Sequence, residues 1–102
     1  MDYEKFHFMD DKVLMGLVTK AIGETFREER KKQKISQHRV SDSANINNSY
    51  YSLIENGEVN PSIYKYLMIC NSLGIVPTIA ISNIMEKLAK EIDAVIAKES
   101  NK

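Results

Sequence analysis

Few side chains in this 102-residue sequence have the type and spacing that catalysis requires. The two histidines, His7 and His38, lie far apart and lack the spacing of metal ligands, so we expect both at the surface. Cys70, the only cysteine, stands among apolar neighbours and is expected to be a buried, inert thiol. The sequence has no glycine-rich phosphate loop and no nucleophile beside a base. It therefore predicts a protein that is not an enzyme and that needs no metal or cofactor.

The segment from Arg27 to Arg39 is strongly charged. It holds six basic residues against Glu28 and Glu29, in a chain whose net charge is zero. A basic helix end of this kind can contact the phosphates of a nucleic acid. An ordinary solvated, lysine-rich helix end has the same composition, and zero net charge is not typical of nucleic-acid binding. The position of this segment in the fold therefore decides how it is interpreted.

Polar residues next to this segment indicate where short helices start and stop. Ser36 is a good N-cap, because its side-chain oxygen can accept a free backbone N–H. Asn45 tolerates the left-handed conformation of a sharp turn. Asn47 can cap the next helix, which Gly57 ends. Two short helices joined by a tight turn form a helix-turn-helix motif, whose second helix enters the major groove of DNA.

Further helices are expected on both sides of this motif. Asn60 is the expected N-cap, and Pro61 the expected first-turn proline, of a helix near 62–73. Upstream, Asp10 can cap a helix whose apolar residues recur at three- and four-residue spacings, so it can run unbroken into the helix before the motif. The sequence therefore predicts an all-α fold, with residues 1–9 as an arm.

The C-terminal tail, residues 77–102, carries a stripe of apolar residues at alternating spacings of four and three. The stripe consists of Ile81, Met85, Leu88, Ile92 and Val95. This is the pattern of a coiled-coil seam, although only two heptads long. Such a helix either folds back on its own domain or joins two chains. We expect dimerisation, because a helix this short is unstable alone in water, with the helix from Asp11 to Ala21 as the alternative interface.

Length and composition are those of one domain with an N-terminal extension and a tail. No apolar run approaches the ~18 residues of a membrane span. The N-terminus lacks the basic and apolar zones of a signal peptide. A lone cysteine argues against a secreted disulfide framework. We therefore expect a cytoplasmic protein.

The segment from Ile22 to Ile75 resembles a known family. Its sequence is IGETFREERKKQKISQHRVSDSANINNSYYSLIENGEVNPSIYKYLMICNSLGI. It is similar to the phage repressor and Cro type of helix-turn-helix domain, also called the xenobiotic-response-element family. The resemblance implies a five-helix repressor-type domain over residues 22–76, preceded by an arm and helical extension (1–21) and followed by a long C-terminal helix. It also implies a two-fold dimer that binds double-stranded operator DNA and usually represses transcription.

The resemblance implies roles for individual residues. Arg30 and Glu55 match positions that form a buried ion pair between the first and third helices. The exposed face of the third helix, which reaches base edges in the family, comprises Asn47, Asn48, Ser49, Ser52 and Leu53. Phosphate contacts are expected from the basic end of the first helix and from three matched positions, together Arg27, Lys31, Lys32, Gln37, Tyr50 and Asn56. The core positions hold Val40, Ala44, Ile46, Tyr51, Ile54, Ile63, Leu67 and Leu73.

The third helix would read bases with little charge. Asn48 can pair bidentately with adenine, and Leu53 can pack on a thymine methyl group, which favours sites rich in A·T pairs. The same helix lacks Arg and Lys, and Glu58 follows it on the side expected to face phosphates. Ser41 stands where the family usually has Ala, and Asn45 where it usually has Gly. Neither change breaks the fold.

The leading hypothesis is a dimeric, sequence-specific transcription regulator that represses by binding an inverted-repeat operator. A restriction-modification controller or an antitoxin of the same fold is a close variant. The rival is a protein-interaction module that binds a partner protein through the N-terminal helix or the tail. Zero net charge and Glu58 favour the rival, whereas Gln37 and Asn48 favour DNA.

Overall fold

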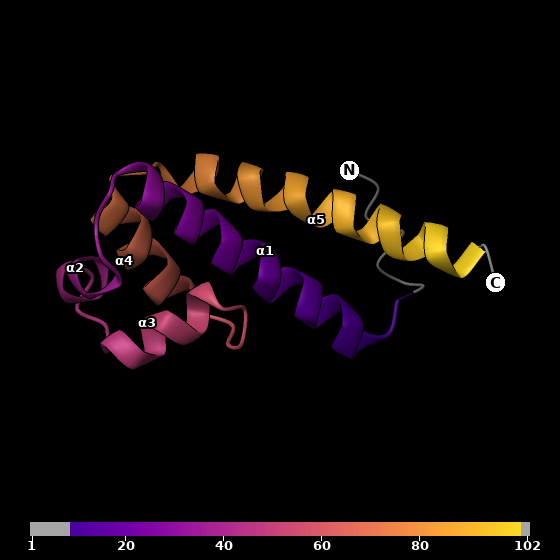
Figure 1. The fold of residues 1–102 in the computed structure, drawn as a ribbon, viewed down its shortest axis with the longest axis horizontal. Coiled ribbons are helices and arrows are strands. Elements are labelled where there is room, and N and C mark those ends of the chain that lie inside the picture. Colours follow the sequence, from indigo (N-terminus) through magenta and orange to yellow (C-terminus); the bar gives the residue numbers. More distant parts are fainter. Residues whose placement is uncertain (1–8, 101–102) are drawn as a thin grey trace.

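The computed structural model describes residues 9–100, which form five α-helices and no strands (Figure 1). The helices are α1 (Asp11–Lys32), α2 (Gln37–Ser43), α3 (Asn48–Glu55), α4 (Ile63–Leu73) and α5 (Pro77–Ser100). The predicted all-α, five-helix fold with a long C-terminal helix is confirmed. Apart from Met9, the predicted arm of residues 1–9 lies outside the described residues, and so does His7.

α1 is a single helix of 22 residues that contains both the predicted N-terminal extension and the helix before the motif. Asp10 caps it, because its carboxylate accepts a hydrogen bond from the backbone N–H of Lys12 at 2.9 Å. The last turn holds Arg30, Lys31 and Lys32, whose positive charges suit the negative end of the helix dipole. The two ends of α1 therefore both favour one uninterrupted helix.

α2 and α3 form the predicted helix-turn-helix. Ser36 caps α2 and Asn47 caps α3, and each side-chain oxygen accepts a hydrogen bond from the backbone N–H three residues later, at 3.1 and 3.2 Å. Between the helices Asn45 adopts the expected left-handed conformation, with φ 57°. Gly57, with φ 75°, turns the chain away after α3. All four local predictions are confirmed.

α4 begins later than predicted. The sequence offers two capping residues in a row, and Ser62 rather than Asn60 caps the helix, so the assignment of Asn60 is wrong. Pro61 lies before the helix and is buried, not in the first turn. α4 ends at Gly74, which is left-handed with φ 68°. α5 then starts at Pro77, whose fixed φ suits the first position of a helix.

The core lies where the helices meet and includes the fully buried side chains of Phe26 from α1, Tyr51 from α3 and Ile69 from α4. The assignment of Ile63 and Leu67 to the core is wrong, because they are 70% and 43% exposed. α4 buries instead the residues spaced along its other side, Tyr66, Ile69, Cys70 and Leu73. The prediction that the Cys70 thiol is buried is confirmed.

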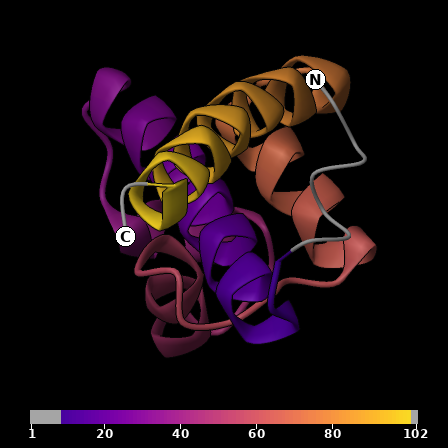
Figure 2. The same ribbon diagram turned by 90° about the vertical axis from the view of Figure 1, so that its right-hand side faces the viewer.

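α5 packs mainly against α1, and the two long helices lie side by side in both views (Figures 1 and 2). Two ion pairs join them: Lys20 lies 3.2 Å from Glu91, and Lys87 lies 2.9 Å from Glu28. Because the later residue of α1 pairs with the earlier residue of α5, the helices are antiparallel. α5 buries four residues at a regular spacing of four, namely Ala80, Ile84, Leu88 and Ile92.

This packing corrects the prediction of an exposed seam on α5. Leu88 and Ile92 are 3% and 1% exposed, because the chain itself covers them. Of the five residues in the stripe, only Ile81 is largely exposed, at 45%. Met85 and Val95 are half-buried. The helix thus folds back on its own domain, and Leu88 and Ile92 cannot form a surface that joins two chains.

No single helix within residues 9–100 is long and apolar enough to cross a membrane. α4 and α5 reach that length and composition only when taken together, and the two helices are bent by 108° where they join.

Candidate DNA-binding surface

A buried ion pair fixes the inner face of α3. Arg30 of α1 donates two hydrogen bonds to the carboxylate of Glu55, from Nε to Oε2 at 2.7 Å and from a terminal nitrogen to Oε1 at 3.0 Å. The Glu55 side chain is fully buried. The ion pair expected between Arg30 and Glu55 is therefore present, and its two parallel hydrogen bonds define how α1 and α3 are oriented.

Two further hydrogen bonds tie α2 into the same cluster. Gln37, at the start of α2, donates from Nε2 to Glu55 Oε1 at 3.0 Å. Arg30 also donates to the backbone oxygen of Ile35, just before α2, at 2.9 Å. One carboxylate thus joins α1, the start of α2 and the end of α3. Gln37, which was expected to contact phosphate, has its amide directed at this carboxylate.

The cluster also keeps Glu55 charged. Burial alone would raise the pKa of its carboxyl group, but Arg30, Tyr51 and Gln37 stabilise the carboxylate and hold the pKa below its usual value. The same pairing raises the pKa of Arg30. Burial next to the carboxylate raises the pKa of Tyr51 as well, so its phenol stays protonated. The ion pair is therefore maintained throughout the neutral pH range.

A glycine allows α1 to approach α3 closely. A Cβ placed on Gly23 would lie 2.5 Å from the backbone oxygens of both Ile54 and Glu55. No other residue type fits there without moving one helix. Gly23 and the Arg30–Glu55 pair therefore hold the last turn of α3 against α1, while its first turn projects away from α1 (Figure 1).

The outer face of α3 presents the residues that were expected to reach base edges. Asn47, Asn48 and Ser49 are exposed, Ser52 is half-buried, and Leu53 is 38% exposed. The side-chain oxygen of Asn47 already accepts the capping hydrogen bond of α3. These five residues therefore share one short accessible surface, with Asn47 at its edge.

The residues that were expected to contact phosphate lie on α1, α2, α3 and the turn after α3. Arg27 donates a hydrogen bond to the side-chain oxygen of Asn56 at 2.7 Å, which brings two of them together beyond the end of α3. Lys31 and Lys32 are exposed at the carboxyl end of α1, and Lys32 lies 3.5 Å from Glu29. These side chains can all be reached by an anion.

One basic residue near α3 was missed by the sequence reasoning. The ammonium nitrogen of Lys65, on α4, lies 4.0 Å from the centroid of the Tyr50 ring, which is a cation–π contact. It brings a positive charge beside a helix that has none of its own. The only sequence signal was a lysine in the first turn of α4, because the contact depends on how α4 packs.

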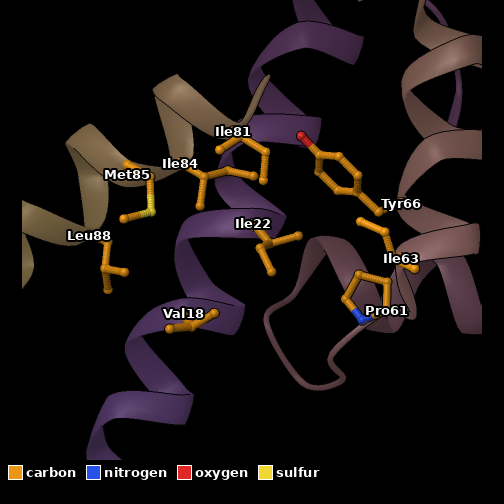
Figure 3. Close-up of a pocket in the computed structure, with 9 residues that line it drawn as sticks. All are labelled: Val18, Ile22, Pro61, Ile63, Tyr66, Ile81, Ile84, Met85 and Leu88. Atoms are coloured by element: carbon orange, nitrogen blue, oxygen red, sulfur yellow. The ribbon is translucent and has the colours of Figure 1, made fainter. Parts of the chain in front are cut away.

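A second feature lies on a different side of the molecule. A groove of about 410 Å³ lies between α1, α4 and α5. Figure 3 shows aliphatic side chains from all three helices turned toward it. Its lining is almost entirely apolar and includes Val18, Pro61, Ile63, Ile81 and Met85. Tyr66 also borders it and donates its hydroxyl hydrogen bond to the backbone oxygen of Pro77, at 2.8 Å.

Comparison with known proteins identifies the family of this chain. A family model described as helix-turn-helix matches residues 26–79, which is more than half of the chain. The chain belongs to the helix-turn-helix family. This confirms the resemblance seen in the sequence. Members of this family are DNA-binding transcription regulators and not enzymes.

Individual members of the family are similar over most of the chain. A relative named transcriptional regulator ClgR, from Mycobacterium tuberculosis, is 30% identical over 78 residues, which cover 76% of this chain and 70% of that protein. The restriction-modification controller protein C.AhdI from Aeromonas hydrophila, whose crystal structure is known, is 26% identical in sequence to this chain. The two structures have a TM-score of 0.59, over 61% of this chain and 94% of that one.

A further solved structure shares the fold. It is the restriction-modification controller protein C.Esp1396I, described as a tetramer in complex with its natural 35-base-pair operator. It is 15% identical and has a TM-score of 0.66, over 71% of this chain and 95% of that one. At this identity the likeness supports the helix-turn-helix fold alone.

Proposed function

We propose that this helix-turn-helix protein is a repressor that binds operator DNA as a homodimer and inserts α3 into the major groove. The observation that carries the proposal is the division of α3 into two faces. The inner face is fixed to α1 and α2 through Glu55, and the outer face exposes Asn48, Ser49 and Leu53. A recognition helix needs this combination, because base contacts require side chains that are held in place yet reachable.

Each side chain of the outer face has a role in this proposal. Asn48 pairs with a purine, Leu53 packs on a thymine methyl group, and Ser49 accepts or donates as the base requires. Ser52 and Asn47 lie at the margins of the contact. Because α3 has no charge to offer a phosphate, its contribution is to sequence preference more than to affinity.

Phosphate contacts come from the surrounding elements. The proposed set is Arg27, Lys31, Lys32, Gln37, Tyr50 and Asn56, joined by Lys65. Arg27 and Asn56 act as a pair, while Lys65 adds charge beside Tyr50. Gln37 contributes its backbone N–H, in the first turn of α2, since its side chain binds Glu55. A cytoplasmic location belongs to the same proposal, because this is where a bacterial or phage operator is found.

The dimer requires a surface other than the predicted seam. We place it on the apolar groove and its rim, where α4 exposes Ile63 at 70% and α5 exposes Ile81 at 45%. Large aliphatic side chains gathered on one face favour burial against a second chain. The rival surface is the N-terminal half of α1, where Val13 and Met15 are 45% and 60% exposed.

Paired aspartate variants separate these two surfaces. Sedimentation of Ile63→Asp/Ile81→Asp is expected to give monomers that keep their helical content, while Val13→Asp/Met15→Asp stays dimeric. The monomeric variant should also lose most of its operator affinity, because an inverted repeat is bound by two linked half-site contacts. A monomeric wild type would refute the proposed dimer. The opposite result for the two variants would place the interface on the N-terminal half of α1.

DNA binding itself is tested with purified protein and duplexes that include the region upstream of its own coding sequence. Wild type is expected to bind at low salt, with log affinity falling as log salt rises. Asn48→Ala should weaken operator binding by about 1–3 kcal/mol and relax preference at one base position. Asn71→Ala is the matched control, because Asn71 is exposed at the far end of α4.

One observation favours a second candidate, a module that binds a partner protein, as an antitoxin does. Within the described chain, α3 carries no basic residue, and Glu58 is exposed directly after it. A surface of this kind repels phosphate more than the recognition helix of a strong DNA binder would. If wild type binds no duplex even at low salt, this candidate replaces the repressor.

A further inference from the structure

The turn between α2 and α3 contains a hydrogen bond that neither motif nor family pattern predicts. Ser41 of α2 lies with its hydroxyl oxygen 3.2 Å from the side-chain oxygen of Asn48, the first residue of α3. The same hydroxyl also donates to the backbone oxygen of His38, at 3.0 Å, one turn earlier in α2, so its single hydrogen is shared between these two acceptors. Ser41 is 2% exposed, whereas Asn48 is exposed. A buried hydroxyl therefore contacts a side chain that belongs to the accessible surface.

We propose that Ser41 is a positioning residue that fixes the side-chain amide of Asn48 and thereby sets the base preference of α3. This inference rests on the proposed function, since it assigns a specific task to one contact of the recognition helix. A serine hydroxyl that donates to the carbonyl oxygen of Asn48 turns that oxygen toward α2. The amide nitrogen, with two hydrogen atoms to donate, is then directed away from Ser41 and toward the groove.

This orientation determines which base edges Asn48 can recognise. In the major groove every purine presents the acceptor N7, and guanine adds the acceptor O6. Cytosine presents only the donor N4–H2 at this edge. An outward amide nitrogen therefore binds either purine and opposes cytosine, because two donors would face each other. Without Ser41 the amide can turn over, present its oxygen, and accept the hydrogen bond of cytosine.

Two neighbouring polar residues do not orient the side chain of Asn48. Gln37, the polar residue at the start of α2, donates its amide hydrogen bond to Glu55 and not to Asn48. Asn47 uses its side-chain oxygen to cap α3. The hydroxyl of Ser41 is thus the group that orients Asn48 from the protein side. Ala is the residue usually found at the position of Ser41, so its hydroxyl can be removed without disturbing the packing of α2.

The test is a double-mutant cycle on base preference. A library of random duplexes first gives the preferred site, and loss of preference in Asn48→Ala marks the base pair that Asn48 reads. Affinities for a purine and for cytosine at that position are then measured for wild type, Ser41→Ala, Asn48→Ala and the double variant. Ser43→Ala is the control, because Ser43 is an exposed serine of the same helix.

Ser41→Ala is expected to lower the purine-to-cytosine affinity ratio by about 2- to 10-fold, the effect of one net hydrogen bond. It should leave affinity for unrelated duplexes unchanged, and Ser43→Ala should leave the ratio unchanged. In the Asn48→Ala background, removal of the Ser41 hydroxyl should have no further effect. Because the ratio compares two duplexes on one preparation, partial unfolding of a variant does not alter it.

Two results would overturn the inference. A ratio unaltered by Ser41→Ala, in a wild type that does bind its selected site, removes the positioning role and leaves the proposed function intact. An equal loss in the presence and absence of Asn48 shows that Ser41 acts by another route. A wild type that selects no site from the library instead refutes the repressor itself, and the positioning role with it.

Discussion

Replacement of Gly23 by Ala tests how closely α1 must approach α3. The added methyl carbon would lie 2.5 Å from two backbone oxygens, of Ile54 and Glu55, and 2.9 Å from a backbone carbon. Ordinary contact begins near 3.4 Å, so the helices must separate by about 0.9 Å. Backbone atoms cannot rotate away as a flexible side chain would. The strain therefore falls on the packing of the whole last turn of α3.

The magnitude follows from two opposing effects. Ala in a helix interior is favoured over Gly by about 1 kcal/mol. Overpacking a tight site costs about 1–3 kcal/mol, and a collision with backbone belongs at the upper end of that range. We expect Gly23→Ala to be destabilised by about 2 kcal/mol in total, which corresponds to a fall in Tm of about 8–16 °C for a domain of this size.

Gly16 provides the matched control on the same helix, because a Cβ there would meet nothing within 4 Å. Gly16→Ala should gain about 0.5–1 kcal/mol, from helix propensity alone. Urea unfolding followed by circular dichroism gives the free energy of unfolding of both variants. If Gly23→Ala is as stable as Gly16→Ala, α1 and α3 are not in the close contact described, and the reasoning is refuted.

Three further predictions concern the buried cluster and α5. Arg30→Ala should lower the free energy of unfolding by about 3–5 kcal/mol, because it leaves the buried carboxylate of Glu55 without its main partner; urea titration measures this. The pKa of Glu55 is lowered in the folded protein, so its ionised carboxylate contributes stability. That stability is fully present above the ordinary glutamate pKa of about 4.3 and is lost as the pH falls through the folded value. The urea midpoint of unfolding should therefore drop in acid, and Glu55→Gln should make that drop smaller. Ile92→Ala should cost about 2–5 kcal/mol at every protein concentration, since Ile92 is buried within one chain and does not line the groove; a loss that depends on concentration would restore it to a dimer interface.

The elements that were predicted correctly are those whose ends are set by local chemistry. Ser36 and Asn47 cap α2 and α3 through hydrogen bonds to residues three positions away, so the sequence alone contains both partners. Asn45 and Gly57 have backbone conformations that few other residues tolerate. The prediction that Asn60 caps α4 was wrong because Ser62, two residues later, can also cap the helix, and the choice between them depends on where α4 packs.

The packing of α5 could not be predicted from its own pattern. The spacing of four and three selected Leu88 and Ile92 correctly as apolar face residues, but it included Ile81 and omitted Ile84. A partner helix decides which neighbouring stripe is covered, and α1 covers the one with a spacing of four. Heptad spacing alone cannot distinguish a second chain from the first helix of the same chain.

Some contacts of the candidate site could be predicted from the sequence and others could not. The pairing of Arg30 with Glu55 could be predicted because the family pattern places both residues. The contact of Lys65 with Tyr50 joins α4 to α3, and a lysine in the first turn of α4 does not show which ring it will reach. The contact of Ser41 with Asn48 crosses the turn, and only the rotamers of both side chains bring it about.

The packing of α1 on α5 also fixes the order in which the protein can be assembled during synthesis. The ion pair between Lys20 and Glu91 joins residues 71 positions apart, whereas α2 and α3 are neighbours in the chain. At about 5–20 residues per second, a ribosome needs roughly 4–14 s to make the chain between those two residues. Helices form in less than a millisecond. The apolar side of α1 therefore stays uncovered for seconds after it emerges, and the period in which a chaperone or an aggregate can capture the chain is governed by translation speed.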